Sequence, residues 1–201
     1  MNTTQGAPGD QAVKGGKKAS TGRTIIEYAV LAVVAISVAL LIQAFLVKPY
    51  RIPSESMEDT LLIGDRVLVD RLSWRFSDPE RADIVVFHPP FTGPVLIKRI
   101  IGMPGDEVSL RDGAVYVNGG PLDEPYVRKI GGKTVPSEPF DNGLPWSLQK
   151  PYKVPADSYF VMGDNRIDSG DSREFGPVSR SQLVGNAFAR YWPPARIGGV
   201  D

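Results

Sequence analysis

The chain offers few side chains for covalent catalysis, and a serine and a lysine are the most promising. It has 201 residues, no cysteine and a single histidine, His88, which leaves no thiol nucleophile and no multi-histidine metal centre. Ser56 lies in the segment Pro53–Met57, and Lys98 follows 42 residues later in an apolar stretch. A serine hydroxyl becomes nucleophilic when a base takes its proton, and a buried, neutral lysine can be that base. The composition therefore favours a serine hydrolase with a lysine base.

Each of these residues also has a purely structural explanation. Lys98 and Arg99 are neighbours in an expected strand, so alternation should turn one of them toward the core, unless both are charges at a sheet edge. Ser56 would equally suit a polar turn. The polar segment 163–173 follows an apolar strand directly and is as typical of a solvated loop as of a site. Taken singly, these segments do not separate a catalytic site from a surface.

Short apolar segments between turns predict a mostly β body. Strands are expected at 66–69, 83–87, 95–101, 114–117, 159–162 and 187–192, with a helical turn at 179–184. Asn118-Gly119 is a strong signal for a tight turn. Residues 118–155 are rich in proline, glycine and charge, and we expect a loop-rich insertion there. The 21 glycines and 18 prolines suit this class better than a helical bundle.

One apolar run precedes the β body. Residues 29–47 carry no charge, and as a helix they would span roughly 28 Å, close to the hydrocarbon thickness of a bilayer. Tyr28 lies at one end as an interfacial anchor would, and Lys48-Pro49 ends the run. We predict a transmembrane signal anchor over residues 25–47. A buried core helix and a cleaved signal peptide are the alternatives.

The charges around this run predict an orientation. Residues 1–24 hold four basic residues and one acidic residue and few large apolar ones, so we expect a disordered, basic cytoplasmic tail. Only Lys48 and Arg51 follow the run closely. The positive-inside rule then places residues 48–201 outside the cytoplasm, as the extracytoplasmic catalytic β domain of a single-pass cell-membrane protein. The net charge of zero argues against nucleic acid as a partner.

Four segments in order resemble the type I signal peptidase family, the membrane-bound Ser/Lys proteases that remove signal peptides. They are residues 52–65 around the serine, 81–87, 97–106 around the lysine, and 163–173. The resemblance covers about residues 25–192, anchor included. It implies a signal-peptidase-like β-sheet catalytic domain on one transmembrane helix. It also implies cleavage of preproteins at small-x-small (Ala-x-Ala) sites with no metal or other cofactor.

The resemblance assigns a role to each matching polar residue. Ser56 corresponds to the nucleophile and Lys98 to the general base. The Ser54 hydroxyl and the Ser56 backbone N–H correspond to the oxyanion hole. Ser169 is expected to hydrogen-bond Lys98 and hold it in line.

Further residues are implied as support and as substrate contacts. Asp171 and Arg173 correspond to a structural ion pair. Small pockets reject large substrate side chains sterically, which accounts for the Ala-x-Ala preference. The implied partners are preprotein signal peptides and membrane lipid, with the protein export channel as a further candidate. The residues expected to line the pockets are apolar: Ile52, Met57, Leu61, Val86 and Ile97.

Four positions depart from the family pattern. Asp59 stands where proline is usual, Ile167 and Asp168 replace Asp-Asn, and Ala82 replaces glycine. A carboxylate at position 59 near the site is expected to raise the pKa of the lysine and to slow the enzyme at neutral pH.

Two other functions are compatible with parts of this pattern. One is a related Ser/Lys protease such as a self-cleaving repressor, against which the membrane segment and the lack of a DNA-binding half argue. The other is a catalytically inert, membrane-anchored peptide-binding protein of the same fold. The joint presence of Ser56, Lys98 and Ser169 argues against that alternative.

Overall fold

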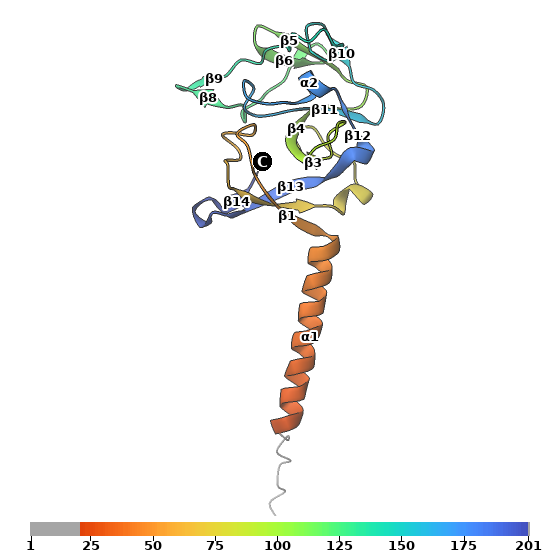
Figure 1. The fold of residues 1–201 in the computed structure, drawn as a ribbon, viewed down its shortest axis with the longest axis vertical. Coiled ribbons are helices and arrows are strands. Elements are labelled where there is room, and N and C mark those ends of the chain that lie inside the picture. The colour runs from red at the N-terminus through yellow and green to blue at the C-terminus, as the bar shows by residue number, and fades with distance from the viewer. Residues whose placement is uncertain (1–20, 201) are drawn as a thin grey trace, which may run out of the picture. The chain divides into compact units, whose positions relative to one another are not determined.

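The computed structural model describes residues 21–200 and contains two compact units, which divide between Leu40 and Leu41. Helix α1 (Thr21–Phe45) supplies the described residues of the first unit, and its last residues, from Leu41 on, belong to the second (Figure 1). Within α1, Gly22–Leu40 is long and apolar enough to cross a membrane. None of this stretch is buried, whereas the core helix of a soluble protein would be mostly buried. Residues 1–20 of the tail expected over residues 1–24 lie outside the described residues.

The second unit is mostly β, which confirms the predicted fold class. Its principal sheet has the strand order β1-β2-β13-β3-β4-β11-β12, and β14 also pairs with β13. Strand β13 is long enough to pair with β2 on one side and β3 on the other, and register irregularities bend it along both pairings. The strands are β1 (Val47–Arg51), β2 (Arg66–Asp70), β3 (Ile84–Phe87), β4 (Leu96–Gly102), β11 (Ser158–Met162), β12 (Val178–Ser179), β13 (Leu183–Trp192) and β14 (Gly198–Gly199).

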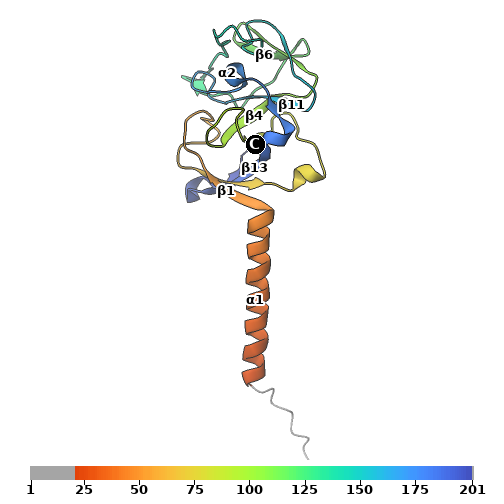
Figure 2. The ribbon, with the colours of Figure 1, turned by 45° about the vertical axis from the view of Figure 1, so that its right-hand side comes forward.

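A smaller sheet has the order β10-β5-β6-β7, and a separate hairpin pairs β8 with β9. Figures 1 and 2 show the smaller sheet on one side of β4 and β11, with β1 and β13 on the other side. Asn118 and Gly119 have φ angles of 52° and 83° and form the predicted tight turn between β6 and β7. These strands are β5 (Glu107–Arg111), β6 (Ala114–Val117), β7 (Gly120–Pro121), β8 (Lys129–Ile130), β9 (Lys133–Thr134) and β10 (Tyr152–Lys153).

The remaining elements are single helical turns, and the predicted turn over 179–184 is one of them. They are η1 (Ser73–Arg75), α2 (Ser172–Phe175), η2 (Arg180–Gln182) and η3 (Pro194–Arg196). The region 118–155, expected to be loop-rich, holds only the two-residue strands β7 to β10. Strands β1, β5, β12 and β14 were not predicted. Residues 187–192, expected as the last strand, are the end of β13, and β14 follows them.

Both faces of the principal sheet are covered where β3 and β4 pair. Ile84 and Val86 belong to one buried cluster, whereas Val85 and Phe87 belong to another on the opposite face. In strand β4, Lys98 pairs with Val85, and its neighbour is buried as well. The expectation that only one of residues 98 and 99 faces the interior is therefore wrong, because alternation sends them to opposite faces of a sheet that is covered on both.

The segment that carries Ser56 is a closed loop, which we call the Ser56 loop (residues 52–65). Its two ends are joined by the hydrogen bonds Ile52 N–Asp65 O and Gly64 N–Ile52 O, both 2.9 Å. Met57 and Leu61 point into the core and are fully buried, so the loop is fixed by its own apolar side chains. Ser56 precedes the buried Met57 directly, so its position is fixed as well.

Candidate active site

The structure brings Ser56 and Lys98 into direct contact. The Lys98 Nζ donates a hydrogen bond of 2.7 Å to the Ser56 Oγ and a second one of 3.0 Å to the Ile97 carbonyl. The two residues are 6% and 3% exposed. Ser56 comes from the Ser56 loop and Lys98 from the middle of β4, so two separate elements must pack together to form the pair.

Burial changes the acidity of the lysine. Loss of hydration lowers the pKa of Lys98 to about 8, although the nearby carboxylates of Asp171, Asp164 and Asp168 act to raise it. At that pKa about a tenth of the amine is neutral at pH 7. Asp59, expected to raise the pKa of Lys98, is not among these carboxylates, and its side chain instead accepts a 3.3 Å hydrogen bond from the Lys129 N–H.

The segment 163–173 holds the backbone of the Ser56 loop. Asn165 donates two hydrogen bonds to it, from its N–H to the Ser56 carbonyl at 3.1 Å and from Nδ2 to the Glu55 carbonyl at 3.2 Å. At Gly163, a Cβ would collide with the Ser56 carbonyl oxygen and with the Ser169 side chain. Gly163 and Asn165 lie in the segment 163–173 that resembles the family, yet no role was predicted for either.

Two further serines lie close to the pair. The Ser54 Oγ is 3.4 Å from the Ser56 Oγ, and no described residue accepts a hydrogen bond from the Ser56 N–H. The Ser169 Oγ is buried and makes no hydrogen bond of ordinary geometry, although its hydroxyl helps to lower the pKa of Asp171. The expected hydrogen bond between Ser169 and Lys98 is not among those that the Lys98 Nζ makes with the described residues.

Asp171 and Arg173 form a buried ion pair with two contacts, Nη2–Oδ2 at 2.8 Å and Nε–Oδ1 at 2.9 Å. Burial acts to raise the pKa of Asp171, but Arg173 and the Gly163 N–H outweigh it, and the pKa lies below its ordinary value. The Gly163 N–H reaches this carboxylate at 3.1 Å. The ion pair therefore fixes the glycine that packs against Ser56.

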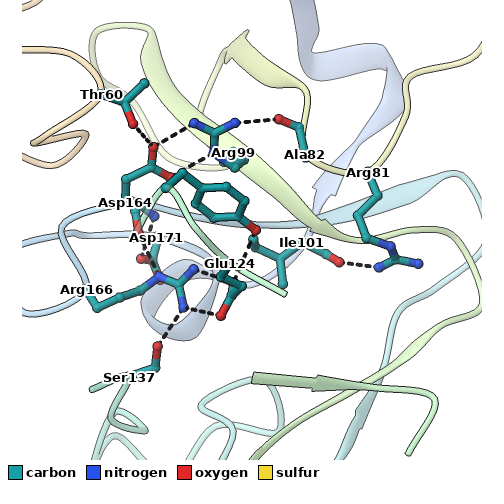
Figure 3. A network of polar contacts seen from close by, with 12 residues as sticks. Thr60, Arg81, Ala82, Arg99, Ile101, Glu124, Ser137, Asp164, Arg166 and Asp171 are labelled. Atoms are coloured by element: carbon teal, nitrogen blue, oxygen red, sulfur yellow. Dashed lines mark hydrogen bonds and ion pairs between the residues drawn. The ribbon is translucent and has the colours of Figure 1, made fainter. Parts of the chain in front are cut away.

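A second buried ion pair was not predicted (Figure 3). Arg99 donates from Nε and Nη2 to both oxygens of Asp164, at 2.9 and 2.8 Å, and from Nη1 to the Ala82 carbonyl at 2.9 Å. The guanidinium also lies 4.0 Å from the centre of the Tyr126 ring. Ala82, at a position where the resemblance implies glycine, has a φ of 74°, in the left-handed region that favours glycine.

Asp164 also reaches the Ser56 loop. The Thr60 hydroxyl donates a 2.6 Å hydrogen bond to the Asp164 carboxylate (Figure 3). Arg99 is next to Lys98 in β4, so this network connects the strand of the lysine to the loop of the serine. Thr60 had no predicted role, because a threonine in a polar turn carries no signal by itself.

An apolar cavity of about 220 Å³ lies beside the Ser–Lys pair. Ile52, Val86 and Ile97, all expected to contact substrate, are among its lining residues. Met57 and Leu61 do not line it, because both are fully buried in the core under the Ser56 loop. The remaining lining residues are Tyr50, Arg51, Pro53, Ser54, Pro94, Val95, Leu96 and Lys98.

A hydroxyl hydrogen-bonded to a buried amine, beside an apolar cavity, is the arrangement that a serine hydrolase with a lysine base requires. Comparisons with known proteins identify the family. The family model described as "Signal peptidase, peptidase S26" matches residues 25–192. The chain therefore belongs to the signal peptidase I family, whose members are serine endopeptidases.

Individual relatives carry the same name. The "Probable signal peptidase I-2" of Synechocystis sp. is 42% identical, with 90% of this chain and 80% of the relative covered. The "Signal peptidase I" of Leptolyngbya laminosa is 41% identical, with 82% and 78% covered. A crystal structure of a signal peptidase I from Enterococcus faecalis V583 is 35% identical, covers 55% of this chain and 97% of its own, and has a TM-score of 0.46.

Proposed function

We propose that this chain removes signal peptides from exported preproteins, with Ser56 as the nucleophile and Lys98 as the general base. The single observation that carries the proposal is the 2.7 Å hydrogen bond from the Lys98 Nζ to the Ser56 Oγ. The pKa of Lys98, lowered to about 8 by burial, supports it because a base must be neutral to accept a proton. Family membership supports the substrate class.

The chemistry proceeds through an acyl-enzyme. Neutral Lys98 takes the Ser56 proton as the Oγ attacks the scissile carbonyl, and the resulting ammonium returns the proton to the leaving amine. The Ser54 hydroxyl and the Ser56 N–H donate to the oxyanion. Lys98, neutral again, then activates the water that hydrolyses the ester between the substrate acyl group and Ser56. No metal or nucleotide takes part in these steps.

The apolar cavity accounts for the cleavage specificity. With a volume of about 220 Å³ and walls that include Ile52, Val86 and Ile97, it suits small side chains at the −1 and −3 positions of the substrate. We therefore assign an Ala-x-Ala preference to the enzyme.

The membrane anchor is part of the proposal. Helix α1 would span the bilayer once, with the N-terminus in the cytoplasm, because four basic residues precede its uncharged part. The catalytic domain would then lie outside the cytoplasm. Anchoring raises the effective concentration of signal peptides, which are themselves apolar, at the site. Lipid and the export channel are the expected further partners.

The test is cleavage of a preprotein with an Ala-x-Ala site in lipid–detergent micelles. We expect wild type to cleave at that site and Ser56→Ala to lose at least about 10³-fold in kcat/KM. A preprotein with leucine at −1 should be cleaved much more slowly. Ser109→Ala, which removes another buried serine hydroxyl but in β5, is the matched control and should retain activity. Wild type that binds the signal peptide without cutting it would support the inert binding protein instead.

The pH profile gives an independent prediction. Because neutral Lys98 is required, kcat/KM should rise with pH and level off above about pH 8, the pKa of that lysine. Asp168 is exposed and acts to raise this pKa, so Asp168→Asn should move the rise to lower pH and increase activity at pH 7. Asp78→Asn removes a surface carboxylate that does not affect Lys98 and should leave the profile in place. A shift of the Asp168→Asn profile to higher pH would contradict the assigned base.

A further inference from the structure

The last part of the chain returns to the Ser56 loop. We call residues 193–200 the C-terminal segment; it contains η3 and β14. Strand β14 pairs with β13, with Gly198 opposite Arg190 and Gly199 opposite Ala189. The match to the family model ends at residue 192, before this segment.

Two arginines converge on one carbonyl of the Ser56 loop. The Thr60 carbonyl accepts hydrogen bonds from the Arg190 Nη1 at 2.9 Å and from the Arg196 Nη2 at 3.2 Å. Arg190 also donates from Nε to the Arg196 carbonyl, which ties the segment to β13. Hydrogen bonds from charged donors are roughly twice as strong as neutral ones, so this carbonyl is firmly held.

The same arginines pair with the acid at the end of the loop. The Asp65 carboxylate lies 3.3 Å from Arg196 and 3.7 Å from Arg190, and it accepts a 2.9 Å hydrogen bond from the Leu62 N–H. Asp65 is only 2% exposed. Little water competes for these contacts, so they constrain the backbone of residues 60–65 more than surface pairs would.

Apolar packing reaches closer to the nucleophile. Val200 is 2% exposed and belongs to the buried cluster that contains Ile52, Met57 and Leu61. Met57 follows Ser56 directly, and the Leu61 N–H donates to the Met57 carbonyl at 2.7 Å. A displacement of the turn over 57–61 therefore displaces the serine.

We propose that the C-terminal segment positions the Ser56 loop, with Arg196 and Val200 as positioning residues. Neither is among the residues that line the apolar cavity, and both act on the serine through Thr60 and the buried cluster. Asp164 and Asn165 also hold the loop, so the segment supplies a second support. The inference rests on the proposed role of Ser56.

Full-length Arg196→Ala and Val200→Ala variants test it in micelles. Loss of either contact should lower kcat roughly 10- to 100-fold, since a displacement of about 1 Å at the reacting atoms can cost that much. KM should stay within about twofold, because the cavity is intact. The rate constant for labelling of Ser56 by a serine-directed probe should fall with kcat, while the final amount of labelled protein stays at the wild-type level. Arg196→Lys, which keeps a charged donor, should recover part of the loss.

Arg180→Ala is the matched control. Arg180 also combines an ion pair, to Asp78 at 3.0 Å, with a hydrogen bond to a backbone carbonyl, that of Trp74 at 2.9 Å, but it does not contact the Ser56 loop. Equal losses in Arg180→Ala and Arg196→Ala would overturn the inference, because the effect would then be general destabilisation. Wild-type kcat and labelling rate in Arg196→Ala and Val200→Ala would overturn it too. Activity that survives Ser56→Ala would instead refute the proposed function.

Discussion

Replacing Lys98 with methionine is expected to lower kcat/KM for a preprotein by roughly 10²- to 10⁴-fold, the usual contribution of a general base. Methionine has nearly the same length and fits an apolar environment, so the fold should survive. The variant loses the amine that lies 2.7 Å from the Ser56 Oγ and would accept its proton. The serine then keeps its proton, and the attack on the carbonyl slows.

The variant Lys98→Arg tests whether Lys98 acts as a base or only as a positive charge. Arginine keeps the charge but does not deprotonate in proteins, so this variant should be about as inactive as Lys98→Met. Cleavage rates, with circular dichroism to verify folding, decide the matter. If either folded variant keeps more than about a tenth of wild-type activity, a different group is the base.

The largest expected effect on stability is that of Arg99→Leu. Removing this guanidinium leaves the Asp164 carboxylate, which is fully buried, without its bidentate partner. Breaking a buried ion pair from one side costs about 3–5 kcal/mol, most of it the penalty of an uncompensated charge. We expect a decrease of that size in the free energy of unfolding, measured by denaturant titration in detergent with tryptophan fluorescence.

The double variant Arg99→Leu/Asp164→Leu is the control. It removes the unpaired, buried charge of Asp164, so it should recover much of the stability that the single variant loses. A double-mutant cycle measures this recovery. Arg81→Leu breaks a more exposed pair, to Asp106 at 2.9 Å, and should cost much less. A loss below about 1 kcal/mol for Arg99→Leu would show that water reaches Asp164.

Local sequence patterns predicted which strands form in the β domain better than they predicted where each strand begins and ends. Alternating or continuous apolar residues between turn signals located β2, β3, β4, β6 and β11, because strand burial depends on residues close in sequence. Strand β1 was missed because its Lys48-Pro49 looked like the end of a helix, and it forms by pairing with β2. The short strand β14 consists of two glycines, which have no strand propensity and pair only because β13 offers a partner.

For the site, the residue types predicted the chemistry. The residues that hold the Ser56 loop are set by long-range packing, which the sequence does not show. Ser56 and Lys98 were selected because few other residues could do covalent chemistry. Several supports of the Ser56 loop act through its backbone carbonyls, as with Asn165 at Glu55 and Ser56. A backbone contact leaves no trace in the identity of the residue that accepts it. Only one of Lys98 and Arg99 was expected to face the interior, since a lone arginine in a strand does not reveal a partner such as Asp164, 65 residues later.

The supports of the Ser56 loop are also distant along the chain, which determines when the loop can be held in place during synthesis. The contact with Lys98 spans 42 residues, that of Glu55 with Asn165 spans 110, and that of Thr60 with Arg196 spans 136. A ribosome makes Ser56 well before the residues that hold its loop, and contacts of such separation along the chain form slowly in folding. A nascent chain that ends before Asn165 therefore carries Ser56 without the hydrogen bonds that hold its loop.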